Sequence, residues 1–316
     1  MVPGHDTDVS APPRATGVDA AAVARAGCVA PRAPSTRAGT AHSVTGPGSC
    51  DDEASASVYA QHYDPAFGRR FAERALDALV VVRGARVLDV ACSTGIFARL
   101  AAHVVGHTGR VVGIDPSPAA IEAARRIDIT SIVEWQTWED ARLAFPDAAF
   151  DVVACQHALH RFADPVAALE DMRRVLAPGG RLGITTWGPI EENPAFAAQL
   201  DATIKAGLDQ SGVVEMLLDA FAYHRIEDLR DLTRAAGFTD VSVRTVRMLT
   251  ALPRVAQWVR VYPSLPPLSR AWRDCTQQAR IQFLSRATEL LRPFEHDGVL
   301  RVQASSRLVV ARAPFR

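Results

Sequence analysis

Apolar runs of strand length alternate with helical patterns along the chain from residue 58 onward. Each run is short and is bounded by charged or turn-forming residues, which is typical of strands buried in a parallel sheet. We expect strands at residues 86–91, 110–115, 132–135, 150–155, 181–187, 241–246 and 307–311. Helical segments between most of these runs predict parallel pairing with right-handed crossovers. The pattern therefore predicts an α/β fold with a doubly wound, mostly parallel, seven-stranded sheet.

Helix signals support this alternation. Apolar side chains recur at helical spacing over residues 64–79, which predicts a helix there. Ser117 with Pro118, and Asp164 with Pro165, each combine a capping residue with a proline at the first helical position, and they predict the starts of two further helices.

Two helix-rich stretches interrupt the alternation, at residues 189–222 and about 252–300. They follow late strands of the predicted sheet and carry large apolar residues such as Phe196, Phe221 and Tyr262. We expect these insertions to form a helical substrate cap with a hydrophobic pocket beneath it, although most of these side chains serve to bury the helices themselves.

Residues 1–54 differ from the rest of the chain because they contain no Phe, Trp, Tyr, Ile or Leu. Such a segment cannot bury enough apolar surface to offset its ordering entropy, so we expect it to be disordered. An alternative is that translation starts later in the chain. Residues 55–316 are expected to form the folded domain.

Charge and cysteine content exclude several classes of protein. Lys and Arg total 35, as do Asp and Glu, so no net field favours nucleic acid or an anionic membrane. The five cysteines form no Cys-x-x-Cys pair, which argues against a disulfide framework and a metal site. No apolar stretch approaches the roughly 20 residues of a membrane span, and no export signal is evident. We expect a cytoplasmic protein with a small-molecule substrate; the oligomeric state stays open.

The loop after the first predicted strand is the first candidate ligand site, because ligands of doubly wound folds bind beyond the carboxyl ends of the strands. Asp89, Ala91, Cys92, Ser93 and Gly95 supply one carboxylate and small residues that allow close approach of a ligand. The dinucleotide fingerprint Gly-x-Gly-x-x-Gly is absent, which disfavours a dehydrogenase. An acidic residue here suits a ligand that carries an ammonium group.

The next two strands end in further candidate residues. Asp115, followed by Pro116, stands where an acidic residue binds both hydroxyls of a ribose. Trp138, Glu139 and Asp140 follow the third strand, where they can supply an aromatic wall and an acceptor for an adenine amino group.

The fourth strand ends in Gln156 and His157, and His160 follows shortly after. We expect Gln156 near the cofactor and regard both histidines as candidate catalytic residues. Packing is the competing explanation for His160, which lies in an apolar context.

Four motifs in sequence carry a family resemblance: VLDVACSTG, VVGIDPSPAAIEAAR, LAFPDAAFDVVACQHALHRF and MRRVLAPGGRLGITTW. In order and spacing they resemble the motifs of class I S-adenosylmethionine-dependent methyltransferases, which have a Rossmann-like fold. Within that class the chain is similar to the branch of ubiquinone and menaquinone C-methyltransferases. The resemblance extends from about Tyr59 to the last predicted strand.

The resemblance implies S-adenosylmethionine as the cofactor. It places Asp89, Ala91 and Gly95 around the methionine part, Gln156 beside its end, and Asp115 on the ribose hydroxyls.

The resemblance also places Glu139 or Asp140 at the adenine amino group. The family's loop usually reads Asp-x-Gly-x-Gly-x-Gly, and this chain has Ala91 and Ser93 at the first two glycine positions. If the second position needs a positive φ, serine there costs roughly 1 kcal/mol or more.

A methyltransferase of this kind needs to position its acceptor and exclude water. An oxygen or carbon acceptor also requires proton removal, for which His157, His160 or His224 can serve. The sequence does not choose the acceptor beyond a small, hydrophobic molecule. A non-catalytic cofactor-binding or regulatory protein with the same fold is the alternative, and Ser93 is its one hint.

Overall fold

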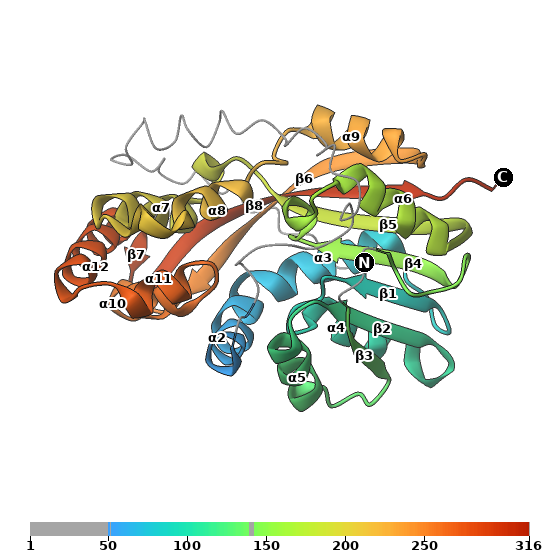
Figure 1. Ribbon diagram of the computed structural model, residues 1–316, viewed down its shortest axis with the longest axis horizontal. Helices are drawn as coiled ribbons and strands as arrows, with labels where there is room; N and C mark the ends of the chain where they lie inside the picture. Colours follow the sequence, from blue (N-terminus) through green and yellow to red (C-terminus); the bar gives the residue numbers. More distant parts are fainter. Residues whose placement is uncertain (1–49, 51, 139–141, 316) are drawn as a thin grey trace, which may run out of the picture.

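The computed structural model describes residues 50, 52–138 and 142–315, and within them a central twisted sheet with helices on both faces (Figure 1). The strand order is β3-β2-β1-β4-β5-β8-β6, and β7 pairs with β8 as a short addition. The strands are β1 Arg86–Val90, β2 Arg110–Asp115, β3 Val133–Thr137, β4 Phe150–Gln156, β5 Leu176–Trp187, β6 Thr239–Leu252, β7 Glu295–His296 and β8 Val299–Arg312. The five strands from β3 to β5 pair in parallel, whereas β8 is antiparallel to β5 and β6. The predicted doubly wound, mostly parallel sheet is confirmed, with a two-residue strand added to the expected seven.

The helices fall into three groups. On one side of the sheet lie α3 Arg69–Leu79, α4 Ile96–Val105 and α5 Pro118–Ile127, and on the other side α6 Pro165–Val175 and α9 Ile226–Ala235. The remaining large helices gather at one end of the molecule (Figure 1): α7 Pro194–Lys205, α8 Val213–Asp219, α10 Val255–Val261, α11 Leu268–Asp274 and α12 Gln277–Leu291. Before α3 the chain forms α2 Glu53–Val58 and a π-helix, Tyr59–Gly68.

Successive residues of β1 point to opposite faces of the sheet, and both faces are buried. Val87 packs in the cluster with α3 and α4, whereas Leu88 and Val90 pack in the cluster with α6 and α9. Each such side chain contributes about 1.5–3 kcal/mol on burial. This two-sided burial explains why the central strands are nearly continuous apolar runs in the sequence.

The strands β6 and β8 extend well past the rest of the sheet. The β5 partner ends at Trp187, opposite Ser306, whereas β6 and β8 stay paired as far as Leu252 and Leu300. Figure 1 shows this two-stranded extension running into the group of α7, α8 and α10–α12. The sequence predicted only residues 241–246 and 307–311, because exposed and charged residues such as Arg247 interrupt the apolar pattern of the extension.

The predicted boundary at residue 54 is too late in the chain. Cys50 is buried with Ala56 and with Ala120 and Ala123 of α5. The Asp52 side chain caps α2 by accepting a hydrogen bond of 2.8 Å from the backbone N–H of Ser55. Polar capping can thus order a stretch without large apolar residues. The rest of the expected disordered segment, residues 1–49 and 51, lies outside the described residues.

Two further findings concern the class of protein. No helix in the described part of the chain is both long enough and apolar enough to cross a bilayer. The four described cysteines, Cys50, Cys92, Cys155 and Cys275, are all free thiols.

We expect a chain that starts at residue 48 to be more stable than one that starts at residue 55. The shorter chain loses the cap of α2, worth about 0.5–2 kcal/mol, and the buried Cys50. Its melting temperature should therefore be several degrees lower in a thermal scan. Equal melting temperatures would show that the α2 cap does not stabilise the domain.

Candidate active site

In the loop after β1, every second residue has a left-handed backbone conformation. Ala91, Ser93 and Gly95 have φ values of 56°, 51° and 77°. At Gly95 a Cβ atom would lie 2.0 Å from the Trp135 ring, so only glycine fits there. Ala91 and Ser93 each hold roughly 1–2 kcal/mol of backbone strain in this conformation. The N–H groups of Cys92 and Ser93 donate to Ile114 and Asp115, so the loop brings its backbone against the carboxyl end of β2 at a cost in stability.

A small chamber of about 20 Å³ lies beside this loop and contains hydrogen-bond acceptors without partners. Asp89 is 1% exposed; its Oδ2 accepts from the backbone N–H of Ala98, and its Oδ1 has no partner among the described residues. Gln156 donates from Nε2 to the Gly68 carbonyl at 2.8 Å, while its buried Oε1 likewise has no described partner. Buried acceptors normally have donors, so these two atoms indicate a ligand site.

Buried carboxyl groups near the chamber have raised pKa values. Burial raises the pKa of Asp89 to about 8, a shift that the hydrogen bond from Ala98 reduces. Burial also raises the pKa of Asp64 to about 6, against the lowering effects of the Thr94 hydroxyl and the Arg99 charge. Asp64 accepts from Thr94 Oγ1 at 2.8 Å. A cation placed here would stabilise the ionised form of both carboxyl groups.

Asp115 lies at the end of β2, next to the loop. Its Oδ2 accepts from the backbone N–H of Ser93 at 2.8 Å, and its Oδ1 accepts from the backbone N–H of Ser117 at 2.9 Å. Burial raises its pKa, while the Arg161 charge and these hydrogen bonds lower it. Ser117 also donates its hydroxyl to the Cys50 carbonyl, so Cys50 lies against this end of the site.

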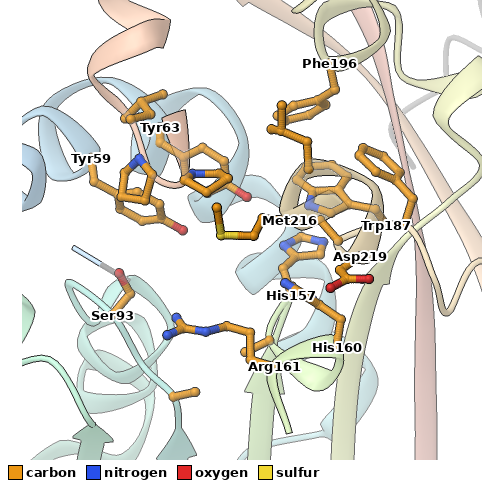
Figure 2. Close-up of a pocket in the computed structure, with 18 of the residues that line it drawn as sticks. Tyr59, Tyr63, Ser93, His157, His160, Arg161, Trp187, Phe196, Met216 and Asp219 are labelled. Atoms are coloured by element: carbon orange, nitrogen blue, oxygen red, sulfur yellow. The ribbon is translucent and has the colours of Figure 1, made fainter. Parts of the chain in front are cut away.

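A cavity of about 330 Å³ opens from the loop toward the helical end of the molecule (Figure 2). The loop side contributes Ala91, Ser93 and Asp115. The opposite walls are mostly aromatic and aliphatic, and include Tyr59, Tyr63, Trp187, Phe196, Leu200, Met216, Leu217, Phe221, Tyr262 and Leu265. Glu215 and Asp219 of α8 also reach the lining. The cavity therefore joins a polar half on the sheet to a mostly apolar half at the helical end of the molecule.

His157 is held rigidly where the two halves meet. Its ring stacks on Trp187 with centroids 4.2 Å apart and meets Phe71 edge to face at 5.2 Å. Its Nε2 lies 3.1 Å from the Ser306 hydroxyl, and its buried Nδ1 has no partner among the described residues. Burial lowers the pKa of His157 to about 3, so the ring is neutral.

His160 and Arg161 also line the cavity, and Figure 2 shows Arg161 extending from the His160 side toward Ser93. Burial, followed by the Arg161 charge, lowers the pKa of His160 to about 3. His224 does not line the cavity, and its Nδ1 lies 2.8 Å from the Phe221 carbonyl. The structure thus brings His157 and His160 to the site but not His224.

The predicted adenine wall is only partly described. Trp138 is buried in a separate small cavity against Phe162, and its Nε1 donates to the Arg142 carbonyl, so it does not line the main cavity. That expectation is corrected: the indole packs into the core between the sheet and α6. Glu139 and Asp140 lie outside the described residues.

Two other predicted contacts are less direct than expected. Pro116 follows Asp115 but is not among the residues that line the main cavity. Cys92 lines the small chamber rather than the main cavity, and burial raises the pKa of its thiol.

Several residues that the structure brings to the site were not predicted from the sequence, among them Cys50, Tyr59, Asp64 and Arg161. Three of these precede β1 in the chain: Cys50 lies in the segment expected to be disordered, Asp64 begins the helix predicted over residues 64–79, and Tyr59 lies between the two. The one available signal was the placement of Asp64 within an otherwise apolar helical face.

The comparisons with known proteins agree with this geometry. A family described as a methyltransferase domain matches residues 88–184. A 2-phytyl-1,4-naphtoquinone methyltransferase of Synechococcus elongatus is 37% identical over 32% of this chain and 45% of its own length. The ubiquinone/menaquinone biosynthesis C-methyltransferase UbiE of Cronobacter sakazakii is 31% identical over 53% of this chain and 71% of its own length. The chain spans about half the length of the first of these relatives.

Two solved structures share the fold. A phosphoethanolamine N-methyltransferase 2 of Haemonchus contortus, in complex with phosphomonomethylethanolamine and S-adenosylhomocysteine, has a TM-score of 0.52 at 17% identity, over 83% of this chain and 57% of that one. The YcgJ protein of Bacillus subtilis has a TM-score of 0.50 at 16% identity, over 78% of this chain and 98% of that one.

A doubly wound sheet with its site at the carboxyl ends of β1, β2 and β4 defines a Rossmann-like α/β domain of the methyltransferase class. Within that class, the chain belongs to the class I S-adenosylmethionine-dependent methyltransferase family, in the branch with the ubiquinone and menaquinone C-methyltransferases.

We predict that Ser93→Gly raises the free energy of unfolding by about 1 kcal/mol, because glycine adopts a φ of 51° without strain. Urea titration measures the change. Ala119→Gly in α5 is the matched control and should lower it by about 0.5–1 kcal/mol. A loss of stability in Ser93→Gly would show that the hydroxyl makes a stabilising contact of its own.

We predict that Asp89→Asn flattens the pH dependence of stability in the cofactor-free protein. The folded pKa of about 8 lies above the unfolded value near 4, so ionising Asp89 costs stability as the pH rises between these values. The variant should lose less stability from pH 5 to 8.5 in urea titrations and should bind S-adenosylmethionine at least tenfold more weakly. An unchanged pH profile would contradict this environment for Asp89.

Proposed function

We propose that this protein transfers a methyl group from S-adenosylmethionine to a small, hydrophobic acceptor. The observation that carries the proposal is the division of one cavity into a polar half on the sheet and an aromatic half under the cap. A nucleoside cofactor suits the first half and an apolar acceptor the second.

The residues present fit the cofactor. The unpartnered oxygens of Asp89 and Gln156 suit the ammonium group of its methionine end. Asp115 suits the ribose hydroxyls, since a carboxylate can accept more hydrogen bonds than the two it has from backbone N–H groups. The left-handed loop at Ser93 lets the backbone approach the ligand closely. We assign no residue to the adenine ring.

The acceptor half supports a small molecule in preference to nucleic acid. Its walls include the rings of Tyr59, Tyr63, Trp187 and Phe196, which offer flat apolar surfaces for stacking. The balanced overall charge supplies no basic surface for a phosphate backbone. The free thiols of the described cysteines are in keeping with the cytoplasmic location that we propose.

When bound, S-adenosylmethionine supplies an electrophilic methyl group on a sulfonium sulfur. The aromatic walls hold the acceptor and keep water away from it. Of the two histidines at the site, we assign proton removal to His160, because it lines the cavity, whereas Nδ1 of His157 is enclosed.

Calorimetry on Asp115→Ala tests this proposal. The parent should bind S-adenosylmethionine and S-adenosylhomocysteine but not NAD. Each hydrogen bond from a ribose hydroxyl to a carboxylate contributes about 1.5–3 kcal/mol, and water fills part of the space left by Asp115. Both ligands should therefore bind the variant about 30- to 150-fold more weakly, which corresponds to about 2–3 kcal/mol.

Asp151→Asn is the matched control, because Asp151 also accepts from a backbone N–H, that of Arg86, but at the start of β4. It should leave both affinities unchanged. A parent that binds neither ligand would overturn the proposal. Labelled-methyl transfer into a metabolite extract then identifies the acceptor.

A further inference from the structure

The small chamber beside the loop has a third unpartnered acceptor besides Asp89 and Gln156. His157 lines the same chamber, and its buried Nδ1 has no partner among the described residues. Six buried side-chain atoms lack partners in the described part of the protein, and three of them belong to residues that line this chamber of about 20 Å³. Such a concentration of unsatisfied groups at one place indicates a ligand.

The hydrogen bonds of Ser306 fix which nitrogen of His157 carries the proton. The Ser306 hydroxyl donates to the Thr186 carbonyl at 2.7 Å, so its single proton is committed. Its oxygen can then only accept from His157, which requires Nε2–H. Nδ1 is therefore the unprotonated nitrogen, an acceptor like Asp89 Oδ1 and Gln156 Oε1.

Three acceptors around a space of this size suit one group with three N–H donors. An ammonium group has three donors and no acceptor, and it fills about the volume of one water molecule. A hydroxyl or an amide nitrogen would leave at least one of the three acceptors unsatisfied. A ligand carboxylate has no donor, so it could not form a hydrogen bond with any of the three acceptors.

We propose that His157 is a cofactor-binding residue, an inference that rests on the proposed function. Its Nδ1 accepts the third hydrogen bond from the methionine ammonium, beside Asp89 and Gln156, and Ser306 is the positioning residue that fixes this tautomer. His157 therefore does not serve as the base that deprotonates the acceptor.

The surroundings of the ring support this role. Trp187 stacks on one face of His157 and Phe71 meets it edge to face, so these two rings hold the plane of the imidazole, while Ser306 contacts its Nε2. Burial lowers the pKa of His157 to about 3, so the ring is neutral at neutral pH and Nδ1 can accept a hydrogen bond there. A fixed neutral acceptor adds a hydrogen bond to the site without a further buried negative charge beside Asp89.

Two substitutions separate the hydrogen bond from the packing of the ring. His157→Phe keeps an aromatic ring against Trp187 but has no acceptor. His157→Asn removes the stacking ring but keeps an amide oxygen near the Nδ1 position, and asparagine tolerates the φ of 51° found there. The ligands are S-adenosylhomocysteine, which has the ammonium group, and 5′-methylthioadenosine, which lacks the whole amino-acid part.

In calorimetry, the substitutions should change the affinity for S-adenosylhomocysteine but hardly that for 5′-methylthioadenosine. We expect His157→Phe to bind S-adenosylhomocysteine about 10- to 100-fold more weakly than the parent, because one hydrogen bond to a charged group is lost. His157→Asn should recover most of this loss. The affinity for 5′-methylthioadenosine should change less than threefold in both variants.

A spectroscopic readout tests the tautomer directly. In the parent, ¹⁵N spectra of labelled histidine, assigned by comparison with His157→Phe, should place Nδ1 of His157 in the unprotonated range. That signal should shift when S-adenosylhomocysteine binds, but not when 5′-methylthioadenosine binds. Ser306→Ala should populate both tautomers, whereas Ser305→Ala, which removes the neighbouring hydroxyl bonded to Glu192, should leave the spectrum unchanged.

The outcomes distinguish this inference from the proposed function. If the parent binds S-adenosylhomocysteine and His157→Phe binds it equally well, the role of His157 is wrong and the proposed function stands. Equal weakening for both ligands would reduce His157 to a packing residue. A proton on Nδ1 in the parent would overturn the hydrogen-bond assignment. A parent that binds neither ligand would overturn the proposed function itself.

Discussion

Burial of acceptor groups without donors is the constraint on which the site depends. Asp89 lies within the central strand of the sheet, 1% exposed, with one oxygen unsatisfied, and such a group costs about 1–3 kcal/mol or more. The cost is tolerable because β1 lies between β2 and β4 and both of its faces are covered by helices. The same burial removes competing water, so a cation that enters gains more from the carboxylate than it would at a surface.

The loop after β1 adds a second cost of the same kind. Non-glycine residues at Ala91 and Ser93 adopt left-handed conformations that the surrounding structure imposes. The hydrogen bond from the Ser93 N–H to Asp115 shows what this conformation achieves, because it ties the loop to the end of β2. Strain and unsatisfied acceptors thus occur at the same site. This is expected where the free energy of ligand binding offsets the stability that both features cost.

Much of this arrangement could be predicted from the chain. The core strands are readable because burial on both faces makes them continuous apolar runs, and Asp89 and Asp115 were identified from their places at or near the strand ends. Trp138 was misplaced because periodicity does not tell whether an indole turns toward a ligand or toward α6.

Other contacts were not readable because they join distant parts of the chain. Cys50 reaches the site through a backbone carbonyl, which has no signature in the side-chain pattern. The role of His157 depends on Ser306, 149 positions away, and no local motif encodes that pairing. The long extension of β6 and β8 was also missed, since its exposed and polar positions break the apolar alternation.

The strand β8 connects the helical end of the molecule, which we propose to be a cap, to the half of the site on the sheet. Ser306 pairs with Trp187 at the end of β5, and these two residues also hold the imidazole of His157 through a hydrogen bond and a stacked ring. The preceding part of β8, with Val302 and Ala304, packs in the core of the cap. The ring centroids of Trp187 and Phe196 of α7 are 4.7 Å apart, so Trp187 also belongs to the proposed acceptor wall. A shift of the cap on acceptor binding would therefore act on the ring that, in our proposal, holds the methionine ammonium. Because a hydrogen bond to a charged group depends strongly on its geometry, acceptor binding and cofactor binding should be energetically coupled through His157.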